Sequence, residues 1–368
     1  MEFKQVIKLG HRYVNQRIRE SLYLSTGYDC TKPFSIRGEV TKQCNYNCIY
    51  CDSLQRNQEI EEMTIDQWQA ALLSLKKFIG SYLIQFTGGG EPFVKKGFVD
   101  LLQFCHREGI QWGVCTNGSA FNNPNIAKKV VAATPMNIDI SVDSATPEIH
   151  DAIRGGADSL NKITQGIKLL REERDHLGLN FPIRIKPTVH FENFRTLPDL
   201  VKWTTKVGAT TIDFAPIRLS KEKLKSSKLW IQKYSDLNHL QQTLNTLVLM
   251  KENGEPIETS HERLHSYPDH FLEKKVFVGS SPCRVGLRHF DISSNGNVRM
   301  CWFYPAIGNV KNKSIHDIWY SEQAKQIRSQ TITCTKYGSV DCANSCLNFR
   351  TFSQEIKRVL LFLRKQKH

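Results

Sequence analysis

Three cysteines stand close together early in the chain, at Cys44, Cys48 and Cys51, with three and then two residues between them. Cysteine thiolates hold iron–sulfur clusters, and a short loop can bring several of them to one cluster. No fourth cysteine follows at once, so three thiolates would hold three irons and leave the fourth iron open to a ligand that is not protein. A zinc knuckle is the alternative, although it usually takes four ligands from one compact unit.

Glycines and polar residues follow several predicted strands of the next hundred residues. A Gly-Gly-Gly-Glu-Pro run begins at Gly88, a Thr-Asn-Gly turn begins at Thr116, and Asp143 directly follows a fourth strand. Glycines let a ligand approach the backbone closely, and a carboxylate can accept hydrogen bonds from an ammonium group. Active sites of parallel β/α proteins form at the C-terminal ends of strands, so these residues are candidates for one shared site.

The elements that must position these residues are short strands alternating with helices, a pattern typical of parallel β/α units. Strands are predicted at Ser35–Thr41, Tyr82–Thr87, Gln111–Thr116, Asn137–Val142, Ile183–His190 and Thr211–Ile217. Helices are predicted at Ile65–Ile79, Gly97–Glu108, Ile126–Ala133, Leu160–His176 and Leu197–Val207. Six units are too few for a complete eight-stranded barrel.

Polar and apolar residues alternate along these strands, whereas strands of parallel barrels usually read as continuous apolar runs. Because the period is two, the polar residues of each strand share one face, and we expect that face to line the lumen of the barrel. Such a lumen suits a polar substrate and cofactor, and ion pairs that only stabilise the barrel are the alternative. The candidate substrate residues are Arg37, Arg184, Lys186 and Asp213.

The cysteine spacing, with Tyr50 before the last cysteine, resembles the motif of the radical S-adenosylmethionine (SAM) superfamily. This resemblance implies an α/β fold with a partial (β/α)6 TIM-type barrel over about residues 35–220, and a 4Fe–4S cluster whose open iron binds SAM. It also implies an enzyme that cleaves SAM to a 5′-deoxyadenosyl radical, which takes hydrogen from the substrate. By the same resemblance, the SAM-binding residues are Tyr50, Gly88, Gly89, Gly90, Glu91, Asn117, Ser141, Asp143 and Arg154.

A second group of cysteines lies near the C-terminus. Cys283 and Cys301 flank two short predicted strands joined by Asn295-Gly296, a good hairpin signal that places these cysteines near one another. The pattern resembles SPASM or twitch modules, which implies one auxiliary 4Fe–4S cluster in a small α+β module; a zinc ribbon is the alternative. The candidate ligands are Cys283, Cys301 and Cys346, with Cys342 ahead of Cys334 for the fourth place.

Composition sets the broad class. The chain has 368 residues, 40% hydrophobic and 23% charged, and no apolar run approaches the thickness of a bilayer. Because the start lacks a signal peptide, the cytoplasm is the expected compartment, and eleven cysteines there indicate metal ligands rather than disulfides. The net charge of +14 would suit a polyanion, but the sequence has no nucleic-acid motif and no partner membrane is expected.

The chain divides, by prediction, into a helical lead-in over 1–34, the barrel over 35–220, a helical connection over 221–278, the module over 279–350 and a basic helix over 351–368. That last helix is expected to dock on the module, with an anionic surface as the alternative. His261, His265 and His270 in the connection are expected at the surface. Cys105 fits a buried helix face, whereas Cys115 could face the lumen as a hydrogen donor to a substrate radical, with core packing as the alternative.

The predicted substrate is a polar, anionic small molecule such as a sugar, aminocyclitol or nucleotide derivative. Only 43 residues precede Cys44, which is short for a folded peptide-recognition domain, and three lumen cations would suit a carboxylate or phosphate. A peptide substrate is the alternative. The resemblance further implies an electron donor of the flavodoxin or ferredoxin type. An alternative of another class is an iron–sulfur electron carrier or redox sensor, which would explain the cysteines but not the glycine run or the polar strand faces. A second is a zinc-dependent nucleic-acid binder, which would explain the net charge of +14.

Overall fold

The computed structural model describes residues 3–51, 61–219, 227–274 and 283–336, together with Ser339 and Cys342, with side chains from residue 11 onward. Cys346 and the predicted helix over 351–368 lie outside the described residues. Within the described ranges, no helix is long and apolar enough to cross a membrane.

The centre of the fold is a nine-stranded sheet in the order β11-β10-β9-β1-β2-β3-β4-β5-β7. Its six barrel strands pair in parallel and confirm the six predicted strands, all of which except the third are shorter than predicted. Their bounds are β1 (Ser35–Gly38), β2 (Leu83–Phe86), β3 (Gln111–Thr116), β4 (Asn137–Ile140), β5 (Ile183–Ile185) and β7 (Thr211–Ile212). The fifth predicted strand breaks at Pro187, which has no N–H to donate, and pairing resumes in β6 (Thr188–Val189) beside β8 (Ala215–Pro216).

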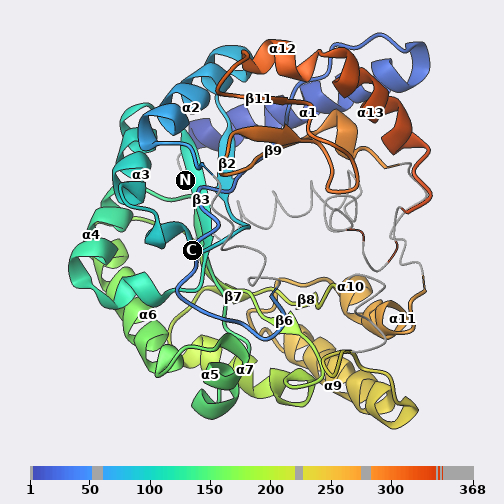
Figure 1. Ribbon diagram of the computed structural model, residues 1–368. Coiled ribbons are helices and arrows are strands. Elements are labelled where there is room, and N and C mark those ends of the chain that lie inside the picture. Colours follow the sequence, from blue (N-terminus) through green and yellow to red (C-terminus); the bar gives the residue numbers. More distant parts are fainter. Residues whose placement is uncertain are drawn as a thin grey trace.

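Helices cover the outer face of the sheet in an arc (Figure 1). They are α2 (Ile65–Ile79), α3 (Phe98–Arg107), α4 (Pro124–Ala132), α5 (Pro147–Arg154), α6 (Ser159–His176) and α7 (Leu197–Lys206). The start of α2 has a local cause, because Thr64 and Gln67 form a reciprocal capping box. Gly80, with a φ of 75°, ends the same helix in a conformation that favours glycine.

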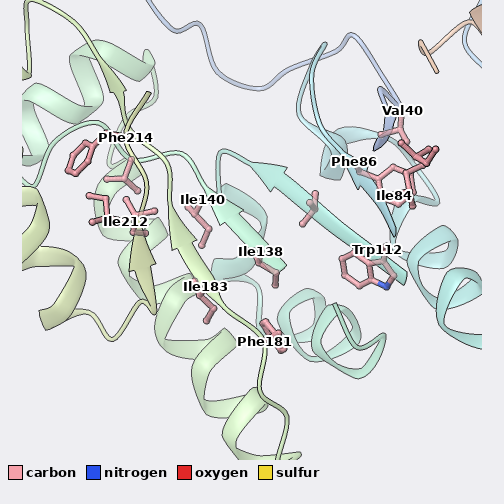
Figure 2. Packing of buried hydrophobic residues seen from close by; sticks show 14 of the residues in the cluster. Val40, Ile84, Phe86, Trp112, Ile138, Ile140, Phe181, Ile183, Ile212 and Phe214 are labelled. Carbon is pink, nitrogen blue, oxygen red and sulfur yellow. The ribbon is translucent and has the colours of Figure 1, made fainter. Parts of the chain in front are cut away.

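The core lies between the sheet and these helices. Ile84, Trp112, Ile138 and Ile183 point to that side from successive strands (Figure 2), and each is at most 1% exposed. Burying a side chain of this size contributes roughly 1.5–3 kcal/mol to stability. The apolar half of the alternating pattern therefore faces the helices, and the polar half faces the lumen, as predicted.

The C-terminal hairpin continues the barrel sheet. Strand β9 (His289–Ile292) pairs in parallel with β1, and β10 (Asn297–Arg299) pairs antiparallel with β9, which confirms the predicted hairpin. Strand β11 (Gly308–Asn309), α12 (Ile315–Trp319) and α13 (Glu322–Ile332) complete this part. The domain boundaries stay predictions.

Helix α1 (Phe3–Thr26) packs against the start of this hairpin. Gln16 donates a hydrogen bond to the carbonyl of Leu287 at 2.7 Å, and buried Glu20 pairs with Arg288 and with Arg284. The lead-in is therefore helical, as predicted, and it ties the first residues of the chain to residues more than 260 positions later.

The predicted connection contributes α9 (Tyr234–Glu252), α10 (His261–His265) and α11 (Tyr267–Phe271). Its segment around Ile257 bridges in parallel to Ile212, so it lies against the last barrel strand. The expected surface position of His270 is wrong: its side chain is buried, bonds to the carbonyl of Ile217 at 2.8 Å and packs on Trp230. A charged sequence surrounds this histidine, so the sequence pattern did not indicate its burial.

Candidate active site

The cysteine loop leaves β1 at the C-terminal edge of the sheet. Cys44 is exposed, whereas Cys48 and Cys51 are half-buried, and the N–H of Cys51 donates to the carbonyl of Cys48 at 3.0 Å. The N–H of Ile49 donates to the carbonyl of Ile153 at 2.9 Å, which ties the loop to α5. Three accessible or half-accessible thiols on one short loop fit a cluster that needs three protein ligands.

The glycine run packs directly against this loop. The N–H of Gly90 donates to the carbonyl of Thr41 at 2.8 Å, and a Cβ at Gly90 would lie 1.8 Å from the carbonyl oxygen of Gln43. Gly89 has a φ of 58°, and a Cβ there would meet Glu39 at 2.4 Å. Close approach of the two loops therefore requires glycine, and the predicted contact of Gly88, Gly89 and Gly90 with SAM stays a prediction.

Glu91 joins the glycine run to the turn after β3. Its carboxylate accepts hydrogen bonds from the hydroxyl of Thr116 and from the N–H of Asn117, both at 2.7 Å, and from the N–H of Phe93 at 3.2 Å. Burial raises the pKa of Glu91, although these donors favour the charged form. The same residue lines a cavity of about 620 Å³ with Asn45 of the cysteine loop. Its carboxylate can thus hold the loops together and still face a ligand.

A buried ion pair lies beside Cys48. Arg154 Nε is 2.8 Å from Asp143 Oδ2, and Arg154 Nη1 is 3.9 Å from the sulfur of Cys48. Tyr50 donates to Asp143 Oδ2 at 3.0 Å and places its ring 5.4 Å from the guanidinium carbon of Arg154. Burial would lower the pKa of Arg154, yet Asp143, Tyr50 and Cys48 together raise it. The structure therefore brings together three predicted SAM-site residues, while Ser141 stands half-buried on the neighbouring backbone.

Several residues that the sequence reasoning missed support this pair. The N–H of Thr188 donates to Asp143 Oδ1 at 2.8 Å, and Asn193 Nδ2 donates to the carbonyl of Asp143 at 2.9 Å. His150 Nδ1 accepts from the N–H of Asp143 at 3.2 Å, and the ring of His190 lies 5.6 Å from that of Tyr50. Their only sequence signal is position: His150 and Asn193 follow the fourth and fifth predicted strands, whereas Thr188 and His190 are among the last residues of the fifth.

The lumen is a cavity of about 840 Å³ whose lining includes the four predicted substrate residues. Two of the cations are paired with carboxylates. Arg184 meets Asp139 at 3.0 Å and Glu258 at 2.6 Å, and Lys186 meets Asp213 at 2.5 Å. The alternative of mutual ion pairs thus holds for Arg184 and Lys186.

Part of this network comes from the predicted connection. Arg263 contacts Asp213 Oδ1 at 3.2 Å, and the hydroxyl of Thr259 donates to the same oxygen at 2.9 Å. Burial would raise the pKa of Asp213, but Lys186 and Arg263 together lower it. Glu258 and Arg263 lie beyond the predicted barrel, so a reading that closed the barrel near residue 220 could not place them in the lumen.

Arg37 differs from the other lumen cations. It is the register partner of Gln85 on β2 and of Asp291 on β9, and it lines the cavity. Within the described ranges it makes no ion pair within 4.0 Å, and the buried Nε2 of Gln85 has no hydrogen-bond partner there. These two donors on neighbouring strands can receive an anionic group.

Cys115 pairs in register with Asp139, and its sulfur lies 3.6 Å from Asp139 Oδ2. Burial, followed by the charge of Asp139, raises the pKa of Cys115 to about 12. The thiol therefore keeps its hydrogen at neutral pH. Its predicted role as a hydrogen donor stays a prediction, and Cys105 is fully buried on α3 as expected.

Cys283 and Cys301 lie together at the hairpin, as predicted, whereas Cys346, a first-choice ligand, lies outside the described residues. Cys283 and Cys301 are buried in one small cluster against which Cys334 packs. Burial raises the pKa of Cys283 to about 12, and the thiols of Cys342, Cys301 and Cys334 act in the same direction. Four gathered thiols fit the ligand set of a 4Fe–4S cluster. No three such ligands in the described residues stand close enough together to hold a single metal ion.

Comparison with known proteins matches two families along the chain. Residues 39–185 match the model of the radical SAM superfamily, and residues 283–346 match SPASM, an iron–sulfur cluster-binding domain. The first match contains the cysteine loop, and the second contains all five C-terminal cysteines. The two domains bind 4Fe–4S clusters and SAM, as the sequence resemblance implied.

Individual relatives are distant. The PqqA peptide cyclase of Bradyrhizobium diazoefficiens is 23% identical over 307 residues, which cover 79% of this chain and 74% of that protein. The AdoMet-dependent heme synthase of Methanosarcina barkeri is 22% identical over 342 residues, 86% of this chain and 91% of that protein. Streptococcus suis SuiB bound to its precursor peptide SuiA has the same fold, with a TM-score of 0.60, 18% identity and coverage of 81% of this chain and 67% of that one.

These comparisons contradict the prediction of a small sugar or metabolite as substrate. Two of the three proteins are named for a peptide substrate or were solved with one. The structure explains part of the difference: the prediction assumed three free lumen cations, whereas carboxylates neutralise Arg184 and Lys186.

Proposed function

Because the chain belongs to the radical SAM superfamily and carries a SPASM domain, we propose that it modifies a peptide by radical chemistry. The observation that carries this proposal is the pairing of β1 with β9. Strand β1 leads into the cysteine loop, whereas Cys283 and Cys301 flank the hairpin of β9 and β10. The pairing therefore joins the strand that precedes one cysteine group to the hairpin that the other group flanks.

In this proposal Cys44, Cys48 and Cys51 hold the SAM-binding cluster, and four of the C-terminal cysteines hold the auxiliary cluster. When bound, the first cluster and SAM supply a radical that takes hydrogen from the substrate. Glu91 and Arg154 would receive the amino and carboxylate groups of SAM, and their position beside the cysteine loop supports this assignment. Glu91 accepts a hydrogen bond from buried Thr116, and Arg154 pairs with buried Asp143, so each side chain is held in one orientation.

The remaining lumen residues would position the peptide. Arg37 and Gln85 would bind a carboxylate of the peptide, while Arg184, Lys186 and Asp213 hold the wall of the lumen through their ion pairs. The protonated thiol of Cys115 would return a hydrogen atom to a carbon radical where the product requires one, and an electron from the donor together with a proton would restore the resulting thiyl radical to the thiol. A flavodoxin- or ferredoxin-type protein would supply the electron, in the reducing cytoplasm that keeps the eleven cysteines free.

The test is modification of a peptide in vitro. The anaerobically reconstituted protein, with SAM and a reductant, is incubated with short peptides encoded beside its gene, and 5′-deoxyadenosine and peptide mass are measured together. We expect a mass change in one peptide, with loss of both signals when Cys44, Cys48 and Cys51 are all replaced by alanine. SAM cleavage that is stimulated by a small metabolite, with every peptide unchanged, would overturn the proposal.

A further inference from the structure

A second basic site lies outside the lumen, in a cleft of about 400 Å³ between α1 and the segments that lead into β1 and β2. Its lining includes His11, Arg12 and Arg19 of α1, Lys32 before β1, and Ser81 before β2. We propose that this cleft binds an acidic segment of the substrate peptide, an inference that rests on the function proposed above.

The charge of the cleft is not balanced by neighbouring acids. None of the described residues that line it is aspartate or glutamate. Arg12 donates to the carbonyl of Pro33 at 2.7 Å and Lys32 to that of Phe78 at 2.9 Å, so neutral oxygens hold two of the cations in place. The acid of α1, Glu20, is instead occupied by arginines of the C-terminal part.

Burial makes this arrangement costly without an anion. Burial lowers the pKa of Arg12 to about 10, and the nearby charge of Arg19 acts in the same direction against the opposite effect of Tyr82. Burial and Arg19 also lower the pKa of Lys32. Like charges held together in a half-buried cleft repel one another, and a carboxylate that enters the cleft removes that repulsion.

The cleft also adjoins the lumen. Arg12 lines both cavities, and Phe34, whose ring lies 5.2 Å from the guanidinium carbon of Arg12, lines the lumen side. An extended peptide with its acidic segment in the cleft therefore has a route past Arg12 to the N-terminal ends of the barrel strands. Such a segment would hold the peptide while neighbouring residues occupy the lumen.

Binding is tested on the full-length reconstituted protein with a short fluorescein-labelled peptide of alternating glutamate and glycine, by fluorescence anisotropy. The double variant Arg19→Glu with Lys32→Glu is expected to raise the Kd about tenfold, because reversing charges at a binding site removes attraction and adds repulsion. The matched control is Lys128→Glu with Lys129→Glu, two exposed residues of α4 that change the net charge equally. It is expected to change the Kd less than about twofold.

An equal loss of affinity in both double variants would overturn the proposal, since it would show attraction by net charge alone. So would an unchanged Kd in the cleft variant, or tighter binding of a single-stranded oligothymidylate than of the acidic peptide at the same cleft. SAM cleavage without peptide reports that each variant is folded. If the double variant does not fold, the single variant Arg19→Glu is used for the binding measurement instead.

The two proposals fail separately. If the acidic probe binds the cleft but no peptide is modified, the docking site stands and the proposed reaction does not. If a peptide is modified equally well with and without acidic flanking residues, and by the cleft variant, the reaction stands and the docking site does not.

Discussion

Arg154 and Asp143 face one another at 2.8 Å, both buried, with Cys48 on the other side of the guanidinium. The pair links the end of β4 to α5 and thereby to the cysteine loop. A buried charge that loses its partner is strongly destabilising, whereas an exposed pair contributes little.

Replacing Asp143 with asparagine should therefore lower the free energy of unfolding by about 3 kcal/mol, because Arg154 keeps its charge without a carboxylate. Chemical denaturation of the cluster-free chain measures this. Lys168→Ala, which breaks an exposed pair with Glu172 at 3.9 Å, is the control and should cost less than about 0.5 kcal/mol. Equal losses in the two variants would show that the buried pair has no special weight.

Glu91 tests the SAM site. Glu91→Gln keeps the shape and can still accept from Thr116, but it removes the charge that would meet the SAM ammonium group. We expect SAM affinity to fall by about 1.5–3 kcal/mol, measured by calorimetry on the reconstituted protein. An unchanged affinity in a variant of normal stability would restrict Glu91 to holding the loops together.

Arg37 and Arg184 should behave differently. Arg37→Ala should raise the KM for the peptide with little change in melting temperature, because Arg37 makes no ion pair in the described part of the chain. Arg184→Ala should lower the melting temperature, because it leaves Asp139 and Glu258 without their cation. The reverse pattern, with binding lost only in Arg184→Ala, would contradict the assignment of Arg37 to the substrate.

The buried histidines predict acid sensitivity. Burial lowers the pKa of His150, His190 and His270 to about 4, so the folded protein resists their protonation. Above about pH 6.5 these histidines are neutral in both the folded and the unfolded chain, and the free energy of unfolding is highest. As the pH falls from there to about 4, the unfolded chain binds protons that the folded protein does not, so the free energy of unfolding decreases. The free energy of unfolding, measured by chemical denaturation at several pH values in this range, should depend less steeply on pH for His270→Gln than for the wild type. The exposed His176→Gln is the control, and an identical curve for both variants would contradict the prediction.

Iron content tests the two cysteine groups. The reconstituted protein should hold roughly eight irons in two clusters. Replacing Cys44, Cys48 and Cys51 together with alanine should leave about four irons, those of the C-terminal cluster. Replacing both Cys283 and Cys301 with alanine should leave about four irons, those of the SAM-binding cluster. Single replacements of Cys334, Cys342 and Cys346 then identify the remaining ligands. Zinc in place of iron at both sites would contradict the whole assignment.

Short-range patterns determined much of this protein. The spacing of Cys44, Cys48 and Cys51 needs only one loop, so the sequence alone could indicate a cluster. The alternation along strands such as Asn137–Ile140 showed which side chains face the lumen, because neighbouring residues of a strand always point to opposite faces. The capping box at Thr64 and the hairpin turn at Gly296 are equally local. Each of these features involves residues only a few positions apart in the chain, so the local sequence is enough to predict it.

Only the tertiary structure decided which charges meet. Glu258 and Arg263 enter the lumen because residues around Ile257 bridge to Ile212, a contact that no local pattern predicts. Glu258 joins Asp139 in pairing with Arg184, and Arg263 joins Lys186 in pairing with Asp213. Arg37 makes no ion pair in the described part of the chain. The pairing of β1 with β9 likewise joins residues about 254 positions apart. Whether a charge is free or paired is a property of three-dimensional neighbours, and for that reason the substrate class was the part of the sequence argument that failed.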